Sequence, residues 1–389
     1  MSEADLYTGR EQTLVKHFIL RNYLERFAII VGHHWDTVTY VDCFSGPWNV
    51  QSDRFEDSSF AIALDQLRKA RDFHRQHGRE LKLRCFFLEK KKSPFLKLKQ
   101  FTETIADAEI EPHNGALEDS VPLIVDFVRK GGRHSFPFIF VDPTGWTGFG
   151  MGTIAPLLRL KPGEVLINFM TEHIRRFIDS PHEQTRQSFV RLFGAINFRS
   201  RLIGLTKQDR EDAIVQEYSR NVKGTGSFTH TSSAIVLHPE KDRTHFHLIY
   251  ATRSTKGVEV FKETEKKAMP VMQQIRGEAR KRKREEASGQ IELSLGDIAH
   301  DPAYYNSLRT RYIGQAKAAV SHLLQEKRTA TYDEVWSLAM TYPMVWESDL
   351  HKWLGDWKKS GLLEVIGMSS KQHTPKTDKG ISCNWRRTS

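Results

Sequence analysis

The stretch SAIVLHPEKDRTHFHLIYAT, residues 233–252, decides which kind of α/β fold the chain adopts. Its two ends, residues 233–237 and 246–252, are rich in β-branched and aromatic residues and are expected to be strands. Only the segment HPEKDRTH joins them, and a crossover between parallel strands needs about a dozen residues or more. The two strands are therefore predicted to form an antiparallel hairpin.

Five apolar runs precede this hairpin, and segments with the apolar spacing of a helix separate them. Strands that alternate with helices imply right-handed parallel crossovers and a doubly wound α/β sheet. Seven strands that end in an antiparallel hairpin resemble the Rossmann-like sheet of the class I S-adenosylmethionine-dependent methyltransferases, and this is the fold class we predict. The five strands are expected at residues 38–44, 83–88, 108–115, 136–142 and 164–169.

The composition bounds the class of protein. With 389 residues, of which 39% are hydrophobic, the chain is long enough for two domains with cores of their own. A net charge of +10 permits a polyanionic partner, although a basic surface needs none. Cys43, Cys85 and Cys383 lack the paired spacing of a zinc site or a disulfide framework, so we expect reduced thiols. No apolar run approaches the roughly 20 residues of a membrane helix and the start lacks a signal pattern, which predicts a cytoplasmic protein without a membrane partner.

The patterns divide the chain into three parts. Residues 1–257 are predicted to form the Rossmann-like domain, with a helical insertion near 174–222, and residues 258–300 a charged helical linker. The cationic run at 280–284 is interpreted as a solvated helix face unless it lines a groove. Residues 301–389 contain three helix-like segments and a two-stranded wing, which predicts a winged helix-turn-helix domain.

Winged helices bind nucleic acid or serve as docking modules for proteins. The charge of the predicted wing favours nucleic acid, because basic side chains there outnumber the single acid, Asp378. These basic residues are Lys371, Lys376, Lys379, Arg386 and Arg387.

The loop after the first strand, DCFSGPWNV at residues 42–50, is the first candidate for ligand binding. A dinucleotide site needs several glycines around the pyrophosphate, and this loop has one, which counts against a dehydrogenase. S-adenosylmethionine has no phosphate, so one tight turn would suffice, with Asp42 orienting the loop or accepting from the ammonium group. A loop without a ligand is the alternative. The residues expected to hold the cofactor here are Asp42, Phe44, Ser45, Gly46 and Pro47.

The next two strand ends offer contacts for an adenosine. Glu89 ends the second strand, where doubly wound nucleoside-binding folds place an acid that accepts from the ribose hydroxyls. Asn114 and Leu117, after the third strand, are expected to contact the adenine ring. An exposed Glu89 and a plain turn at Asn114 would look the same in sequence.

The fourth strand ends in FPFIFVDPTGWTGFG, residues 136–150, and supplies the candidate catalytic residues. Methyl transfer to an exocyclic amine requires the nitrogen lone pair to point at the methyl group, and the Asp142 carboxylate and the Pro143 carbonyl would accept the amine hydrogens. Trp146 would stack on an extruded base, and Gly145, with Thr144 before it, would let the ring approach the backbone. The alternative is a capped strand end with a buried Trp. The scattered histidines show no metal-ligand spacing, so no metal is expected.

Four motifs, in this order along the chain, resemble the three-Cys-motif partner proteins: TLVKHFIL at 13–20, YVDCFSGP at 40–47, FVDPTGW at 140–146 and EVLINFM at 164–170. The resemblance extends from the first helix into the C-terminal domain. It implies S-adenosylmethionine as the cofactor and a radical-type iron–sulfur protein as a partner. The cysteines that name the family belong to that partner and not to this chain.

The first helix and strand also resemble the ribosomal RNA adenine-N6 methyltransferases, which carry a Lys–His pair before this loop. That resemblance implies that Lys16 and His17 close over the cofactor or substrate. The alternative is a pair on the solvated side of the helix. The sequence Asp-Pro-x-Gly at Asp142 resembles the tRNA guanine-N2 methyltransferases, which also act on a base amine.

Three departures from the family pattern bear on activity. Trp48 replaces a glycine of the first loop, and Asp57 changes the charge where the family has a Gly-Ser-Pro. Thr144 stands where amine methyltransferases have a second Pro.

Two functions of different class remain open from the sequence. The first is an S-adenosylmethionine-dependent N-methyltransferase that acts on an exocyclic base amine of RNA or DNA. The second is a methyltransferase-like module that has lost turnover and binds nucleic acid or a partner protein. A nuclease is a third reading, but the sequence offers no metal-ligand set for it.

Overall fold

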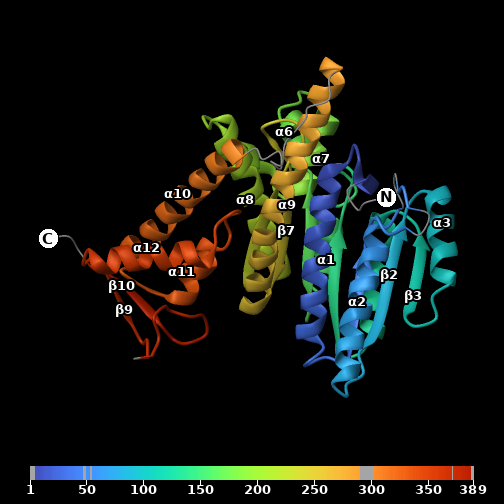
Figure 1. Ribbon diagram of the computed structural model, residues 1–389, viewed down its shortest axis with the longest axis horizontal. Coiled ribbons are helices and arrows are strands. Elements are labelled where there is room, and N and C mark those ends of the chain that lie inside the picture. The colour runs from blue at the N-terminus through green and yellow to red at the C-terminus, as the bar shows by residue number, and fades with distance from the viewer. Residues whose placement is uncertain (1–4, 47–49, 53–54, 290–301, 370, 387–389) are drawn as a thin grey trace.

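The computed structural model describes residues 5–46, 50–52, 55–289, 302–369 and 371–386 (Figure 1). At its centre is a seven-stranded sheet in the order β3-β2-β1-β4-β5-β7-β6. The strands are β1 (Thr37–Asp42), β2 (Lys82–Glu89), β3 (Glu109–Asn114), β4 (Ser135–Val141), β5 (Glu164–Phe169), β6 (His230–Leu237) and β7 (Thr244–Thr252).

The direction of the strands confirms the predicted fold class. Strands β1 to β5 run parallel to one another, whereas β7 is antiparallel to both β5 and β6. The short link between β6 and β7 turns the chain back directly, as its length requires. The sheet is therefore the seven-stranded, Rossmann-like sheet with a terminal antiparallel hairpin that is typical of methyltransferase-like folds.

Helices cover both faces of this sheet (Figure 1). Along β1, Val38 and Tyr40 point into one hydrophobic core and Val41 into the other, because side chains alternate across a strand. One core lies under α1 (Glu11–Val31), α2 (Ser59–Gln76), α3 (Lys92–Glu103) and α9 (Thr255–Ser288). The other lies under α4 (Leu117–Lys130), α5 (Met151–Leu158), α6 (Thr171–Phe177), α7 (Glu183–Phe193), η2 (Ile196–Leu202) and α8 (Lys207–Gly226).

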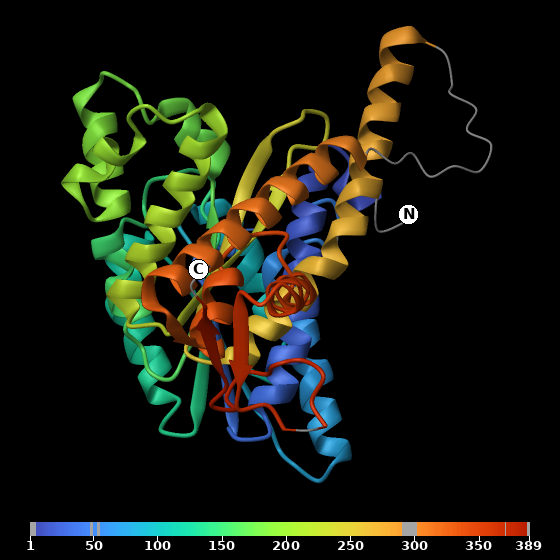
Figure 2. The same cartoon turned by 90° about the vertical axis from the view of Figure 1, so that its left-hand side faces the viewer.

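The C-terminal region forms a second, smaller unit beside the β6 edge of the sheet (Figure 2). It consists of α10 (Pro302–Lys327), β8 (Thr329–Thr331), α11 (Tyr332–Ala339), α12 (Glu347–Lys359), β9 (Leu363–Ile366) and β10 (Ser382–Trp385). The three strands pair in the order β8-β10-β9. Three helices and two wing strands were expected, and β8 adds a third strand. The winged-helix interpretation of this unit remains a prediction.

A buried ion pair joins this unit to the large sheet. Lys262 on α9 pairs with Glu265 one turn later, and both side chains are almost fully buried. Lys262 also donates to the carbonyl oxygen of Tyr342 at 2.8 Å, and Glu265 accepts the backbone N–H of Met344 at 2.8 Å. The charges therefore hold the loop between α11 and α12 against α9.

Helix α9 occupies most of the range predicted to be a linker. Its first half packs into the core above the sheet, with Val258, Phe261 and Met272 buried. The cationic run near its end pairs with acids of the β6–β7 hairpin and of α1. These ion pairs are Arg280 with Asp242, Arg282 with Glu11, and Lys283 with Glu240.

Two sequence expectations concern membranes and cysteines. Within the described ranges, no helix combines the length and the apolar character needed to cross a membrane. Cys43, Cys85 and Cys383 are all buried and form no disulfide bond. Burial raises the pKa of Cys85 to about 12, so this thiol stays protonated and inert near neutral pH.

Candidate active site

A cavity of about 600 Å³ opens at the carboxyl ends of β1, β4 and β5. Ligands of open α/β sheets bind at this edge of the sheet. One wall is the segment from Thr8 to His17, and the starts of α6 and β7 also line the cavity. Predicted site residues that line it are Lys16, His17, Phe44, Gly46, Asp142, Pro143 and Thr144.

Asp142 lies inside this cavity with both carboxylate oxygens engaged. Asn168 donates its side-chain N–H to Oδ1 at 2.6 Å, and Lys16 forms an ion pair with Oδ2. The side chains of Lys16 and Asp142 are each 12% exposed. The Asp142 carboxylate therefore already binds a cation and an amide at this edge of the sheet.

Asn168 was not among the predicted site residues. Because Val141 of β4 pairs with Ile167 of β5 in parallel register, the next residue on each strand, Asp142 and Asn168, come side by side. The sequence signal was a polar residue near the end of each apolar run, with Asp142 at the end of the fourth predicted strand and Asn168 one residue before the end of the fifth. Asn168 thus fixes the Asp142 carboxylate.

Asp42 shapes the loop after β1 and is closed off from solvent. Its Oδ1 accepts the backbone N–H of Phe44 at 3.0 Å, and its Oδ2 accepts the hydroxyl of Ser59 at 2.6 Å. Burial raises the pKa of Asp42 to about 6, although the two hydrogen bonds lower it in part. Ser45 is also buried and donates its hydroxyl to the carbonyl of Asp42. Of the two roles expected for Asp42, orienting the loop is the one these contacts support.

Pro47 and Trp48 lie outside the described residues. The rest of this loop is organised by Asp57, which the sequence suggested only as a change of charge near the cofactor. Its buried carboxylate accepts the backbone N–H groups of Gln51 at 2.9 Å and Ser52 at 3.2 Å, and it forms an ion pair with Arg10. Arg10 therefore compensates the negative charge of Asp57, and the Asp57 side chain connects the loop to the start of α1.

The Lys16–His17 pair lies on a buried face of α1, so the alternative of a solvated pair does not hold. His17 is 4% exposed, and its Nδ1 lies 2.9 Å from the hydroxyl oxygen of Tyr7. Burial, together with the charges of Lys16, Arg10 and Arg21, holds the pKa of His17 well below its usual value. The imidazole is neutral at pH 7, and the cations at this wall are Arg10 and Lys16.

Three predicted adenosine contacts, Glu89, Asn114 and Leu117, lie next to this cavity's strand ends but do not line it. Glu89 is only 3% exposed, which rules out the solvated alternative, and its carboxylate accepts the backbone N–H of Lys91. Asn114 donates to the carbonyl oxygens of Glu89 at 2.7 Å and Lys90 at 3.2 Å, while Leu117 is buried in a core. The turns after β2 and β3 are thus bound to each other.

Gly145 and Trp146 do not line the cavity either. The indole N–H of Trp146 donates to the hydroxyl of Ser188 at 2.9 Å. Its ring stacks on Phe189 with a centroid distance of 5.5 Å and packs against Phe177 at 4.9 Å. This placement favours the packed-Trp alternative over a free stacking platform.

Glu172 and His245 also belong to this edge of the sheet, and the sequence did not single them out. His245, on β7, lines the cavity, and its Nδ1 lies 2.7 Å from Oε2 of Glu172 on α6. The two residues are far apart in sequence, so only the pairing of β7 with β5 brings them together. Within the described part of the chain, no group of three or more His, Cys, Asp or Glu side chains is placed to hold a metal ion.

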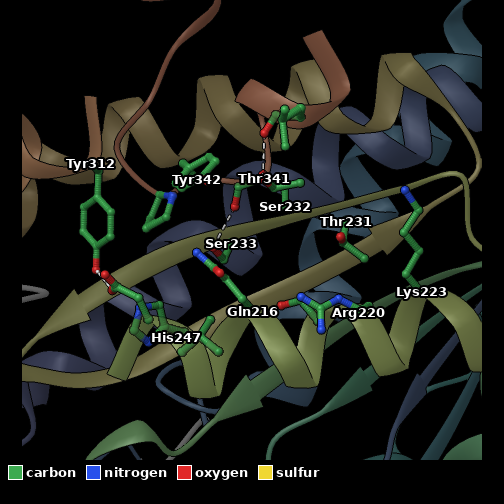
Figure 3. A pocket seen from close by; sticks show the side chains of 15 residues that line it. Gln216, Arg220, Lys223, Thr231, Ser232, Ser233, His247, Tyr312, Thr341 and Tyr342 are labelled. Atoms are coloured by element: carbon green, nitrogen blue, oxygen red, sulfur yellow. Dashed lines mark hydrogen bonds between the residues drawn. The ribbon is translucent and has the colours of Figure 1, made fainter. Parts of the chain in front are cut away.

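A second cavity, of about 250 Å³, lies between α8, the edge strand β6 and the C-terminal unit (Figure 3). Its hydroxyl groups bind across the interface, since Ser232 donates to the carbonyl oxygen of Met340 at 2.7 Å and Ser233 to that of Thr341 at 3.2 Å. Asp212 is engaged in the same way by the Tyr312 hydroxyl at 3.0 Å. These polar groups fasten the two units together.

The fold and the site together define an α/β protein with a methyltransferase-like sheet and a polar cavity at its ligand-binding edge. No family model matches the sequence, and no curated protein matches it. The resemblance to the three-Cys-motif partner proteins and to the ribosomal RNA methyltransferases therefore rests on the motifs alone.

Solved structures show remote likeness only. A DUF519-family protein of Legionella pneumophila has a TM-score of 0.38 at 10% identity over 66% of this chain and 91% of its own. A fibrillarin/Nop5p complex has a TM-score of 0.30 at 12% identity over 56% and 73%. Loganic acid methyltransferase with SAH has a TM-score of 0.30 at 7% identity over 74% and 92%. At such low scores, the fold assignment rests on the strand order and not on these likenesses.

Proposed function

We propose that the protein is an S-adenosylmethionine-dependent N-methyltransferase that acts on an exocyclic base amine of RNA or DNA. One observation carries the proposal: Asp142, at the end of β4, projects into a cavity at the ligand-binding edge of a methyltransferase-like sheet, fixed by Asn168 and beside Pro143. A carboxylate and a backbone carbonyl at one strand end are acceptors suited to the two hydrogens of an amine.

The residues present fit the proposed cofactor. The cavity falls within the roughly 300–1,000 Å³ of small-molecule sites. It carries two ion pairs, Arg10 with Asp57 and Lys16 with Asp142, and a ligand with both a carboxylate and an ammonium group would complement their charges. When bound, S-adenosylmethionine would supply an electrophilic methyl group. Phe44 and Gly46 are the loop residues in position to hold it.

Glu89 is the proposed acceptor for the ribose hydroxyls. Since its carboxylate accepts the N–H of Lys91 and is nearly buried, ribose binding there requires the turn after β2 to open. Glu89→Ala is therefore expected to weaken cofactor binding at least tenfold in a calorimetric titration, while unchanged affinity would remove Glu89 from the site.

In the chemical step, the ion pair between Lys16 and Asp142 breaks, and the substrate binds the Asp142 carboxylate in place of Lys16. A neutral amine then donates one N–H to Asp142 and the other to the carbonyl oxygen of Pro143, which directs its lone pair along the line of attack. Lys16 is held nearby on α1 and stays close enough to fix the carboxylate again after product release.

The nucleic-acid part of the proposal rests on charge. The net charge of the chain is +10, and Lys371, Lys376, Lys379 and Arg386 of the C-terminal unit are all exposed. Exposed Lys and Arg side chains bind phosphates without reading sequence. Binding should therefore weaken steeply with salt.

The proposal is tested by incubating the protein with S-adenosylmethionine labelled in its methyl group and either total RNA or denatured DNA. Asp142→Asn is expected to reduce transfer by about 100-fold or more, because the amine loses its charged acceptor. Asp126→Asn, an exposed Asp on α4, is the matched control. Absence of transfer by the unaltered protein to both pools would falsify the proposal.

The second candidate is an adaptor without turnover that binds nucleic acid or a partner protein. The engagement of both Asp142 oxygens and the packing of Trp146 favour it. Titration with S-adenosylmethionine distinguishes the two functions. Clear binding that Glu89→Ala abolishes supports the enzyme, and no detectable binding supports the adaptor.

A further inference from the structure

Glu172 and His245 form a carboxylate–imidazole pair at the wall of the cavity. Glu172 lies in the first turn of α6, directly after β5, and His245 lies near the start of β7, which pairs with β5. Oε2 of Glu172 and Nδ1 of His245 are 2.7 Å apart, and both side chains are largely buried. His245 shares the cavity with Asp142 and Lys16.

The charge on Glu172 fixes where the imidazole proton sits. Burial acts to raise the pKa of Glu172, but the hydrogen bond with His245 and the charges of His245 and Arg243 outweigh it and hold the pKa below its usual value. An ionised carboxylate only accepts hydrogen bonds, so Nδ1 of His245 carries the proton and Nε2 carries a lone pair. Among the described residues, no hydrogen bond to Nε2 is found.

The surroundings keep this imidazole neutral and able to accept a proton. Burial is the main cause that lowers the pKa of His245, and the charges of His173 and Arg243 lower it further, while Glu172 opposes them. His238, in the turn between β6 and β7, packs edge-on against the His245 ring, and the two ring centroids are 5.8 Å apart. The other charged side chains that line the cavity are those of Arg10, Lys16, Asp57 and Asp142.

We propose that His245, oriented by Glu172, is the general base of this site. The inference rests on the proposed methyl transfer. The amine lone pair forms the new bond to the methyl carbon, the sulfur–carbon bond breaks with its electrons going to sulfur, and the nitrogen is left with one proton in excess. That proton leaves along the N–H bonded to Asp142, the Asp142 carboxylate passes it to Nε2 of His245, and Glu172 stabilises the resulting imidazolium.

A role in holding the hairpin alone does not account for this arrangement. Arg243 already forms an ion pair with Glu172, and that contact is enough to fasten the β6–β7 turn to α6. The imidazole adds a second contact to the same carboxylate, and of the two residues His245 is the one that lines the cavity. The combination of an acid, an oriented imidazole and an open cavity is that of a catalytic base.

The test compares His245→Gln with His134→Gln, a control on an exposed histidine. The rate of labelled methyl transfer is measured in a single turnover from pH 5 to 9, with cofactor affinity from calorimetry. His245→Gln is expected to lose about 100-fold in rate, as is typical when a general base is removed, with cofactor affinity unchanged. The fall in rate that the unaltered protein shows at acidic pH should vanish in His245→Gln, and added imidazole should restore part of the rate of His245→Gly.

A second readout does not depend on turnover. Nitrogen NMR of the unaltered protein should show His245 protonated at Nδ1 near neutral pH, with a pKa below that of a free imidazole. In Glu172→Gln the pKa should fall further, because the carboxylate that raises it is gone.

The role of His245 as general base is overturned if His245→Gln transfers methyl groups within threefold of the rate of the unaltered protein. It is also overturned if the fall in rate at acidic pH is unchanged in this variant. Either result leaves the proposed function intact. Absence of transfer by the unaltered protein overturns both. An Nε2-protonated His245 in the NMR spectrum also overturns the inference.

Discussion

At the scale of single residues, the site consists of acids whose environments differ sharply. Asp42 is closed off and bound by Phe44 and Ser59, so it supports the loop. Asp142 lines the cavity, where it binds Lys16 and Asn168, so it is the acid that we propose for catalysis. In the sequence, Asp42 and Asp142 both stand near the end of a predicted strand, so the sequence does not distinguish their roles. The contacts with α1 and α2 distinguish them, because Ser59 of α2 binds Asp42 and Lys16 of α1 binds Asp142.

Asn168 should act through Asp142. Asn168→Ala removes the donor to Oδ1 and lets the carboxylate turn, so we expect the turnover rate to fall about tenfold or more with cofactor affinity unchanged. The transfer assay measures this effect. Asn221→Ala, which alters an amide hydrogen bond on α8, is the control, and equal rates for the two variants would contradict the role of Asn168.

Asp42 should make stability depend on pH. Its pKa is raised to about 6 in the folded protein and lies near 3.8 when unfolded, so the folded state holds the proton more tightly. The protonated Asp42 therefore stabilises the folded state fully below about pH 4. This stabilisation, on the order of 3 kcal/mol in the free energy of unfolding, is lost as the pH rises through about 6. Urea unfolding of the protein and of Asp42→Asn at both pH values measures it, and an equal pH dependence in the two would refute it.

At the scale of elements, a buried hydrogen-bond network holds α1 on the sheet. Glu164, at the start of β5, accepts hydroxyl groups from Tyr23 of α1 at 2.6 Å and from Thr252 of β7 at 2.8 Å. Tyr23 also lies 2.6 Å from the hydroxyl of Tyr250. Burial raises the pKa of Glu164. Since Lys16 lies on the same helix, this network at the far end of the sheet sets the position of the cavity wall.

Tyr23→Phe should therefore destabilise the fold. It leaves a buried carboxyl group without one of its donors, at a cost of about 1–3 kcal/mol in the free energy of unfolding. Urea unfolding gives the value, with Tyr305→Phe, a half-buried tyrosine of α10, as the control. A loss no larger than that of the control would mean that the network contributes little.

The elements were largely predictable, and the contacts between them were not. The alternation of apolar runs with helices correctly predicted the parallel strands, and the length of the 238–245 link correctly predicted the terminal antiparallel hairpin. The packing of Trp146 on Phe189 depended on how α6 and α7 fold within a region that the sequence presented only as helical. The pairing of Glu172 with His245 depended on the register of β7 against β5, which no local pattern specifies.

At the scale of the whole molecule, two units share a polar and charged interface. Lys262 and Glu265 are buried there, with Arg309 of α10 donating to Asp349 of α12 nearby at 2.9 Å. A buried ion pair adds little net stability, but loss of one partner leaves an uncompensated charge. The basic surface of the C-terminal unit is thereby held at a fixed place relative to the sheet.

Lys262→Met should loosen this connection. The unpaired Glu265 costs about 3–5 kcal/mol, and we expect limited proteolysis near residues 340–346 that the unaltered protein resists. Removing both charges in Lys262→Met with Glu265→Leu should restore much of the resistance. Lys256→Met, which alters an exposed pair on the same helix, is the control, and equal proteolysis of both single variants would argue against the role of the buried pair.

The central claim is methyl transfer to a base amine, and the product itself tests it most directly. Nucleic acid labelled by the protein from S-adenosylmethionine is digested to nucleosides, which are separated and identified by mass spectrometry. The account predicts a single nucleoside methylated on its exocyclic nitrogen, with a yield about 100-fold or more lower when Asp142→Asn replaces the unaltered protein. A methyl group on ribose or on a ring carbon, or a labelled nucleoside whose yield is unchanged with Asp142→Asn, would contradict it.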